Sequence, residues 1–106
     1  MPSDIAVSLA SALAALPADK PFAELFRRDG EISVELYAPQ GVDRQTPHSR
    51  DELYIVAEGT GTFRRADETV TFGPGDLLYV PAHMVHRFET FSPDFKVWVI
   101  FYGPER

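Results

Sequence analysis

Two histidines and one glutamate in this chain are of the types that hold metal ions. His48 and Glu52 lie four residues apart in the segment TPHSRDE, and His86 ends the segment YVPAHMVH. Two imidazoles and a carboxylate suit iron, manganese, zinc, nickel or copper and leave coordination positions open. The spacing alone is a weak signal, because three ligands from two segments match many sequences by chance.

The chain must turn for His48 and Glu52 to share an ion. In a straight strand, residues four apart face the same way but lie roughly 13 Å apart. A helix would make them neighbours. However, Pro47 and the strand-forming segment LYIV after Glu52 disfavour a helix. His48 therefore reaches Glu52 only if the chain turns through the segment SRD between them.

The surroundings of His86 predict the start of a strand. Pro81 ends the preceding strand, and a tight turn follows before His86. Alternation along a strand puts Phe88 on the same face as His86, and it puts Tyr54 on the same face as Glu52. Aromatic side chains on such a face more often belong to the hydrophobic core than to the wall of a substrate pocket. Any pocket is expected to be small and apolar, with the metal as its main polar feature.

The remaining elements follow from the hydrophobic periodicity. Near the N-terminus, apolar residues recur at steps of four, four and three, which predicts one amphipathic helix with Ser3 as N-cap and Pro17 as stop. These apolar residues are Ile5, Leu9, Leu13 and Leu16. We expect this helix to pack on the outside of the structure that follows.

From Phe22 onward the period changes to two, as in the segments ISVELY and TVTF. The segments RDGE, RADE and GPGD are turn signals between such runs, and GPGD suits a type II turn. We predict seven to nine short strands in an all-β fold. A jelly-roll β-barrel is the first choice and an open sandwich the second. Residues 1–20 are then an N-terminal helix and arm, and residues 21–106 a single barrel.

Composition excludes several classes of protein. The chain has 106 residues, enough for one domain, and no cysteine, so disulfides and thiolate metal sites are excluded. A net charge of -6 without a long basic run argues against binding to nucleic acid or to an anionic membrane. No apolar stretch approaches the roughly 20 residues that span a bilayer. The N-terminus lacks the basic region of a signal peptide, so we expect a cytoplasmic protein.

Two motifs resemble those of the cupin superfamily. The segment HSRDELYIVAEG, from His48 to Gly59, matches the second histidine, the glutamate and the closing glycine of the first cupin motif. The segment GDLLYVPAHMVH, from Gly75 to His86, is similar to the second motif. The resemblance covers about half of the chain. It implies a small single-domain cupin with an RmlC-like jelly roll and one divalent transition metal held by His48, Glu52 and His86.

The chain departs from the family pattern at two positions. Thr46 stands where the first metal-binding histidine belongs, and His83 stands where the turn usually has glycine. Three ligands then remain. The Thr46 hydroxyl is expected beside the ligands or bonded to a metal-bound water, and His83 on the surface or at a pocket rim. The alternative is a barrel that has lost its metal, with Glu52 as an internal salt-bridge partner.

The resemblance implies two candidate functions. The first is a metal-dependent enzyme acting on a small organic molecule, as a dioxygenase, isomerase, lyase or decarboxylase. The second is a non-catalytic cupin that binds or senses a small ligand, with or without metal. Beyond the ligands, no inward-facing carboxylate or lysine can be placed, which favours metal redox chemistry or binding over proton transfer.

The last apolar segment, FKVWVIFYG, predicts a strand whose two faces both need cover. One face belongs to the barrel interior. The other, near Trp98, is expected to meet a second subunit, so we predict a homodimer.

Overall fold

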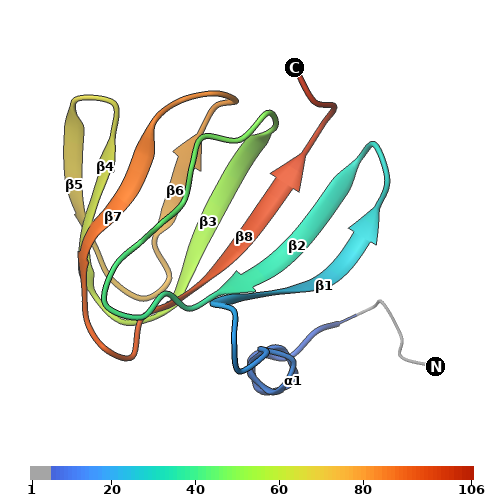
Figure 1. The fold of residues 1–106 in the computed structure, drawn as a ribbon, viewed down its shortest axis with the longest axis horizontal. Helices are drawn as coiled ribbons and strands as arrows, with labels where there is room; N and C mark the ends of the chain where they lie inside the picture. Colours follow the sequence, from blue (N-terminus) through green and yellow to red (C-terminus); the bar gives the residue numbers. More distant parts are fainter. Residues whose placement is uncertain (1–5) are drawn as a thin grey trace.

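Eight strands form two antiparallel sheets whose inner faces share one core (Figure 1). The computed structural model describes residues 6–106. The first sheet has the strand order β1-β2-β8-β3-β6, and the second has the order β5-β4-β7. The strands are β1 (Phe22–Arg28), β2 (Ile32–Tyr37), β3 (Asp51–Glu58), β4 (Gly61–Arg65), β5 (Glu68–Phe72), β6 (Leu77–Val80), β7 (His86–Phe91) and β8 (Lys96–Tyr102).

The two sheets do not close into a barrel. Within residues 6–106, each strand pairs only with strands of its own sheet, so β1 and β6 are the edges of one sheet and β5 and β7 of the other. The all-β class is confirmed. The expected barrel describes the arrangement of the strands only approximately, because the two sheets are not joined by hydrogen bonds. The chain passes between the sheets through separate connections, such as the one after β3, and no ladder of hydrogen bonds joins β6 to β5.

The predicted strand count and turns are confirmed. The turn segments RDGE, RADE and GPGD separate β1 from β2, β4 from β5, and β5 from β6. In GPGD, Gly75 has a φ of 87°, and the Asp76 amide donates to the Gly73 carbonyl at 3.1 Å. These are the features of a type II turn. Strand β6 ends immediately before Pro81, and β7 begins at His86.

The helix is shorter than the periodicity predicts. Helix α1 spans Leu9–Ala14, and its N-cap is Ser8, whose side chain accepts a hydrogen bond from the Ser11 amide at 3.0 Å. The expected cap, Ser3, lies outside the described residues. Ser8 has an extended backbone, so the helix begins after it and the prediction of one longer helix was wrong. Among residues 6–106, no helix has the length and apolar content needed to cross a membrane.

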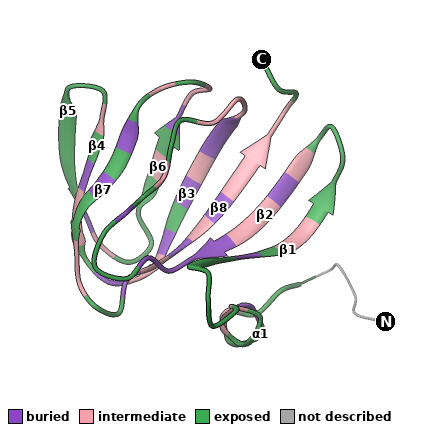
Figure 2. Cartoon of the chain, viewed as in Figure 1, coloured by how far each residue is buried: buried purple, intermediate pink, exposed green. Residues whose placement is uncertain are grey.

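Phe88 lies at the centre of the core between the sheets. Its ring packs at centroid distances between 4.8 and 5.6 Å against four aromatic rings, which are those of Tyr54, Phe63, Phe72 and Phe95. Figure 2 shows that buried residues recur along the strands of both sheets, as expected when one face of each sheet is covered. This aromatic core packs β3 of the first sheet against β7 of the second.

Gly59 is required where the chain leaves β3 for the second sheet. Its φ is 93°, and a Cβ added there would lie 2.6 Å from the Phe95 Cα. We expect Gly59→Ala to lower the free energy of unfolding by about 2 kcal/mol or more, because it combines backbone strain with a clash against main chain.

Gly73→Ala is the matched control for this prediction. Gly73 has no positive φ, and no heavy atom lies within 4 Å of its added Cβ. Urea unfolding of both variants measures the difference. Equal midpoints would contradict the role assigned to Gly59.

Candidate metal centre

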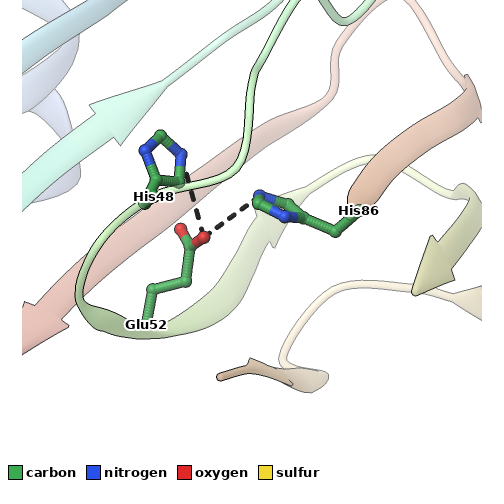
Figure 3. A group of neighbouring side chains, drawn as sticks. All are labelled: His48, Glu52 and His86. Atoms are coloured by element: carbon green, nitrogen blue, oxygen red, sulfur yellow. Dashed lines mark ion pairs between the residues drawn. The ribbon is translucent and has the colours of Figure 1, made fainter. Parts of the chain in front are cut away.

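The side chains of His48, Glu52 and His86 converge on one point (Figure 3). Each residue offers one ligand atom, and these three atoms all lie within 4.8 Å of one another. The His48 Nε2 lies 3.8 Å from the Glu52 Oε1, and the His86 Nε2 lies 3.0 Å from the same oxygen. The residues that the sequence singles out therefore come together in space.

Two sheets and one bend position these three side chains. Glu52 lies near the start of β3 in the first sheet, and His86 is the first residue of β7 in the second. His48 precedes β3, and the chain bends at Ser49 and Arg50, as the distance argument requires. The His83 amide donates to the His48 carbonyl at 2.6 Å, which ties the two ligand-bearing segments together.

Three buried polar atoms of this cluster have no hydrogen-bond partner. They are both carboxylate oxygens of Glu52 and the Nε2 of His86. Glu52 is completely buried and His86 is 3% exposed. Although the His86 Nε2 is 3.0 Å from the Glu52 oxygen, the atoms are not aligned as a hydrogen bond. Unpaired polar atoms at such depth are rare, and a cation among them would satisfy all three. The residues present therefore fit a divalent ion.

The two histidines have opposite pKa shifts. Burial lowers the pKa of His48, and the neighbouring His86 adds to this effect, while Glu52 opposes it. Burial also disfavours the charged form of His86, but Glu52 and the Met84 carbonyl outweigh it and raise the pKa. His48 is thus held in the neutral form that binds metals, and a metal at the site would replace the proton on His86.

A backbone carbonyl orients His86. Its Nδ1 lies 2.9 Å from the Met84 carbonyl and donates to it, so the unprotonated Nε2 of the neutral ring points at Glu52. Such a partner behind a histidine ligand fixes the tautomer and the ring direction.

Two residues missed by the sequence reasoning support the site from the connection between β2 and β3. Gln45 lies 3.4 Å from the His48 Nε2 through its Oε1, and the same oxygen accepts from the Tyr54 hydroxyl at 3.0 Å. Asp43 is 1% exposed and accepts from the Gln45 amide at 3.0 Å and from the Phe88 amide at 2.9 Å. In the sequence, these two residues resemble the polar residues of any loop, and no local pattern indicates that they support a metal site.

Of the other candidates, Tyr54 and Phe88 are core residues. Their rings are buried, and only the Tyr54 hydroxyl reaches the site, through Gln45. Burial and the nearby Glu52 raise the pKa of Tyr54, so its hydroxyl stays protonated. His83 is exposed, with a φ of 68°, and its ring contacts the Arg106 carbonyl away from the cluster.

Thr46 and His48 line a cavity of about 500 Å³ beside the cluster. Its other walls include Phe22, Glu35, Arg44 and Phe101. Glu35 is an inward-facing carboxylate beyond the ligands, a group that could not be placed from the sequence. The cavity places one side of His48 within reach of a small molecule.

Comparison with known proteins identifies the family. The model of the cupin domain matches residues 33–101. The uncharacterized protein SCO3923 from Streptomyces coelicolor is 39% identical over 82 residues, which are 76% of this chain and 78% of that protein.

Two solved structures are similar in fold. A cupin superfamily protein from Desulfitobacterium hafniense has a TM-score of 0.67 and 21% identity, covering 97% of this chain and 94% of that chain. KdgF from Halomonas sp. has a TM-score of 0.67 and 22% identity, covering 80% of this chain and 78% of that chain. Because the cupin domain model matches more than half of the residues of this chain, the chain belongs to the cupin superfamily.

Proposed function

We propose that this cupin binds one divalent transition metal through His48, Glu52 and His86 and acts as an enzyme on a small organic molecule in the adjoining cavity. The observation that carries the proposal is that three buried polar atoms on Glu52 and His86 have no hydrogen-bond partner, although the two side chains lie within ion-pair distance of each other. A protein core does not normally retain such atoms unless something else satisfies them. A cation held by two imidazoles and one carboxylate does so and neutralises the buried charge.

The cavity supports a small, oxygen-bearing ligand. Its walls combine apolar side chains, such as Phe22 and Phe101, with a few polar groups. A ligand with two oxygen atoms fits the open side of a three-ligand site. When bound, the ion would supply Lewis-acid or redox chemistry to that ligand.

The chain's own residues would orient the ligand and exclude water. Phe101 packs edge-on against His48 at a centroid distance of 5.0 Å, which restrains the imidazole at the cavity wall. Gln45, held by Asp43, contacts the Nε2 of the same ring at 3.4 Å. The aromatic core behind Glu52 and His86 closes the far side, so a ligand approaches from the His48 side.

Cobalt(II) spectroscopy tests whether the ion and the cavity form one site. We expect metal-free protein to take up Co²⁺ with a visible absorption band, and we expect millimolar pyruvate to shift that band. Thr46→Trp is the control, because it fills the cavity from an exposed position without changing a proposed ligand. It should keep the Co²⁺ band and lose the response to pyruvate. A band that does not respond in the parent protein would contradict the proposed function.

A further inference from the structure

Glu35 lies on the inner face of the first sheet, at the wall of the main cavity. On β2 it pairs with Glu24 of β1 on one side and Val99 of β8 on the other. Val99 in turn pairs with Tyr54 of β3, two residues from Glu52. Directly paired residues share a face, so Glu35 points to the same side of the sheet as Glu52.

Glu35 and His48 line the same space. Both belong to the walls of the 500 Å³ cavity, and both line a second hollow of about 230 Å³ beside it. Strands β2 and β3 are separated only by β8, and Glu52 lies two residues along β3 from Tyr54, the residue level with Glu35. The Cα atoms of Glu35 and Glu52 are therefore roughly 12 Å apart. This separation leaves room for a molecule of a few heavy atoms between the Glu35 carboxylate and the metal cluster.

The Glu35 carboxylate has no partner among residues 6–106. No hydrogen bond or ion pair to it is formed there, although it is half-buried. Arg27, the cation whose charge acts on Glu35, instead pairs with Glu24 at 2.6 Å and with Asp29 at 3.4 Å. The structure therefore leaves Glu35 available to a ligand rather than using it to hold the fold.

The environment of Glu35 favours its protonated form. Burial raises its pKa, and Glu24 and Glu52 add to this effect, while Arg27 opposes it. A carboxyl group of this kind exchanges protons closer to neutral pH than an exposed glutamate does, which suits a general acid or base. Tyr37, Arg44 and His48 are the other titratable or charged groups that line the main cavity with it, and Arg27, Arg50 and Glu105 join it and His48 in the second hollow.

Arg44 indicates the class of ligand. Arg44 lines the main cavity, and its exposed side chain forms no ion pair within residues 6–106, so it is free to meet an anion. A small 2-oxo acid carries the matching groups: a carboxylate for Arg44, a carbonyl oxygen for the metal cluster, and a carbon-bound proton next to that carbonyl.

We propose that Glu35 is the acid–base residue of this cavity and moves a proton on the carbon next to the carbonyl of a small 2-oxo acid. The inference rests on the proposed function, because it places the carbonyl oxygen at the metal cluster. The ionised Glu35 takes the proton. The electrons of the C–H bond form a C=C bond, and those of the C=O bond move to the oxygen. Return of the proton to carbon restores both groups, so the step needs no oxidant or reductant.

Exchange of the methyl protons of pyruvate in D₂O, followed by NMR, tests this role. Parent protein, Glu35→Gln and Glu31→Gln are each loaded with Mn²⁺, and metal content is measured before the exchange assay; Mn²⁺ is removed before spectra are taken. Glu31 is the control because it lies on the same hairpin but is exposed and paired with Arg28. We expect equal metal content in all three proteins, exchange catalysed by the parent and by Glu31→Gln, and at least ~100-fold slower exchange with Glu35→Gln.

Unfolding of the metal-free proteins gives a second readout that does not depend on activity. Because the folded-state pKa of Glu35 is raised, its ionisation above that pKa destabilises the fold, and the destabilisation disappears on acidification below the ordinary glutamate pKa of the unfolded chain. Glu35→Gln should therefore unfold at a higher temperature than the parent at pH 7, and the difference should shrink towards pH 4. Glu31→Gln should not show this pH-dependent gain.

The outcomes separate this inference from the proposed function. A parent protein that takes up no metal would contradict both. A metal-loaded parent without exchange, or a Glu35→Gln variant with parental exchange, would overturn the role of Glu35 alone. So would a difference in unfolding temperature that stays the same between pH 7 and pH 4.

Discussion

Replacing His86 with alanine is expected to lower the affinity for a divalent transition metal by at least about 100-fold. Removing a residue that hydrogen-bonds to a metal ligand already lowers metal affinity 10- to 100-fold, and removing the ligand itself lowers it further. His86 is 3% exposed, and its Nε2 is one of the three buried atoms at the site that have no hydrogen-bond partner. Alanine removes this donor and leaves only His48 and Glu52, a pair that holds such ions weakly.

His83→Ala is the matched control, because it removes an imidazole from the same connection between β6 and β7. His83 is exposed and lies outside the cluster, so this variant should keep the parental affinity. Competition against a chromophoric chelator with the same metal measures both variants. If His83→Ala lost the metal and His86→Ala kept it, the assignment of the ligands would be wrong.

Asp43→Ala is expected to lower the free energy of unfolding by about 3 kcal/mol or more. The buried Asp43 carboxylate accepts from the Tyr37 hydroxyl at 2.6 Å, from the Phe88 amide at 2.9 Å and from both nitrogens of Gln45 at 3.0 and 3.2 Å. Alanine leaves the first two donors buried without a partner, and each such group costs roughly 1–3 kcal/mol. The same change also frees Gln45 from its position beside His48.

Chemical denaturation of metal-free protein measures this effect, with Asp19→Ala as the control. Asp19 is exposed and forms no hydrogen bond within the described part of the chain, so its replacement should change stability by less than about 0.5 kcal/mol. A loss of less than about 1 kcal/mol on Asp43→Ala would mean that the hydrogen bonds of Asp43 with Tyr37 and Phe88 do not stabilise the fold as expected.

The sequence predicts the parts of the site that depend on neighbouring residues. Pro81 and the turn after it place His86 at the first position of β7, and the bend before β3 lets His48 approach Glu52, as expected. Both features are local, because proline, turn residues and strand-forming segments act within a few residues. The chain could therefore be divided correctly into strands and turns without knowledge of its tertiary structure.

The rest depends on contacts between residues far apart in the sequence. Alternation in β2 identifies a strand, but it does not say which face turns inward. In the structure, Tyr37 joins the core cluster and Glu35 lines the cavity. Asp43 finds its partner Phe88 at a separation of 45 residues. No local pattern specifies such a pairing, so the supporting network and Glu35 were missed.

The separation into two sheets also lies beyond the reach of the local pattern. Short strands with glycine and proline turns are compatible with a closed barrel and with an open sandwich. The outcome depends on whether the edge strands β6 and β5 meet, and they do not pair. Open sandwich, the second choice from the sequence, describes the hydrogen bonding more closely than the closed barrel.

The metal content of the purified protein tests the central claim most directly. The chain should be produced without a histidine tag, stripped with a chelator, incubated with Mn²⁺, Fe²⁺, Co²⁺, Ni²⁺, Cu²⁺ or Zn²⁺ in turn, desalted, and analysed by mass spectrometry of the elements. We predict about one equivalent per chain of at least one of these ions, which fits the single cluster of three ligand atoms within 4.8 Å. Retention of none of the six ions, or equal retention by a variant that lacks His48, Glu52 and His86, would contradict the account.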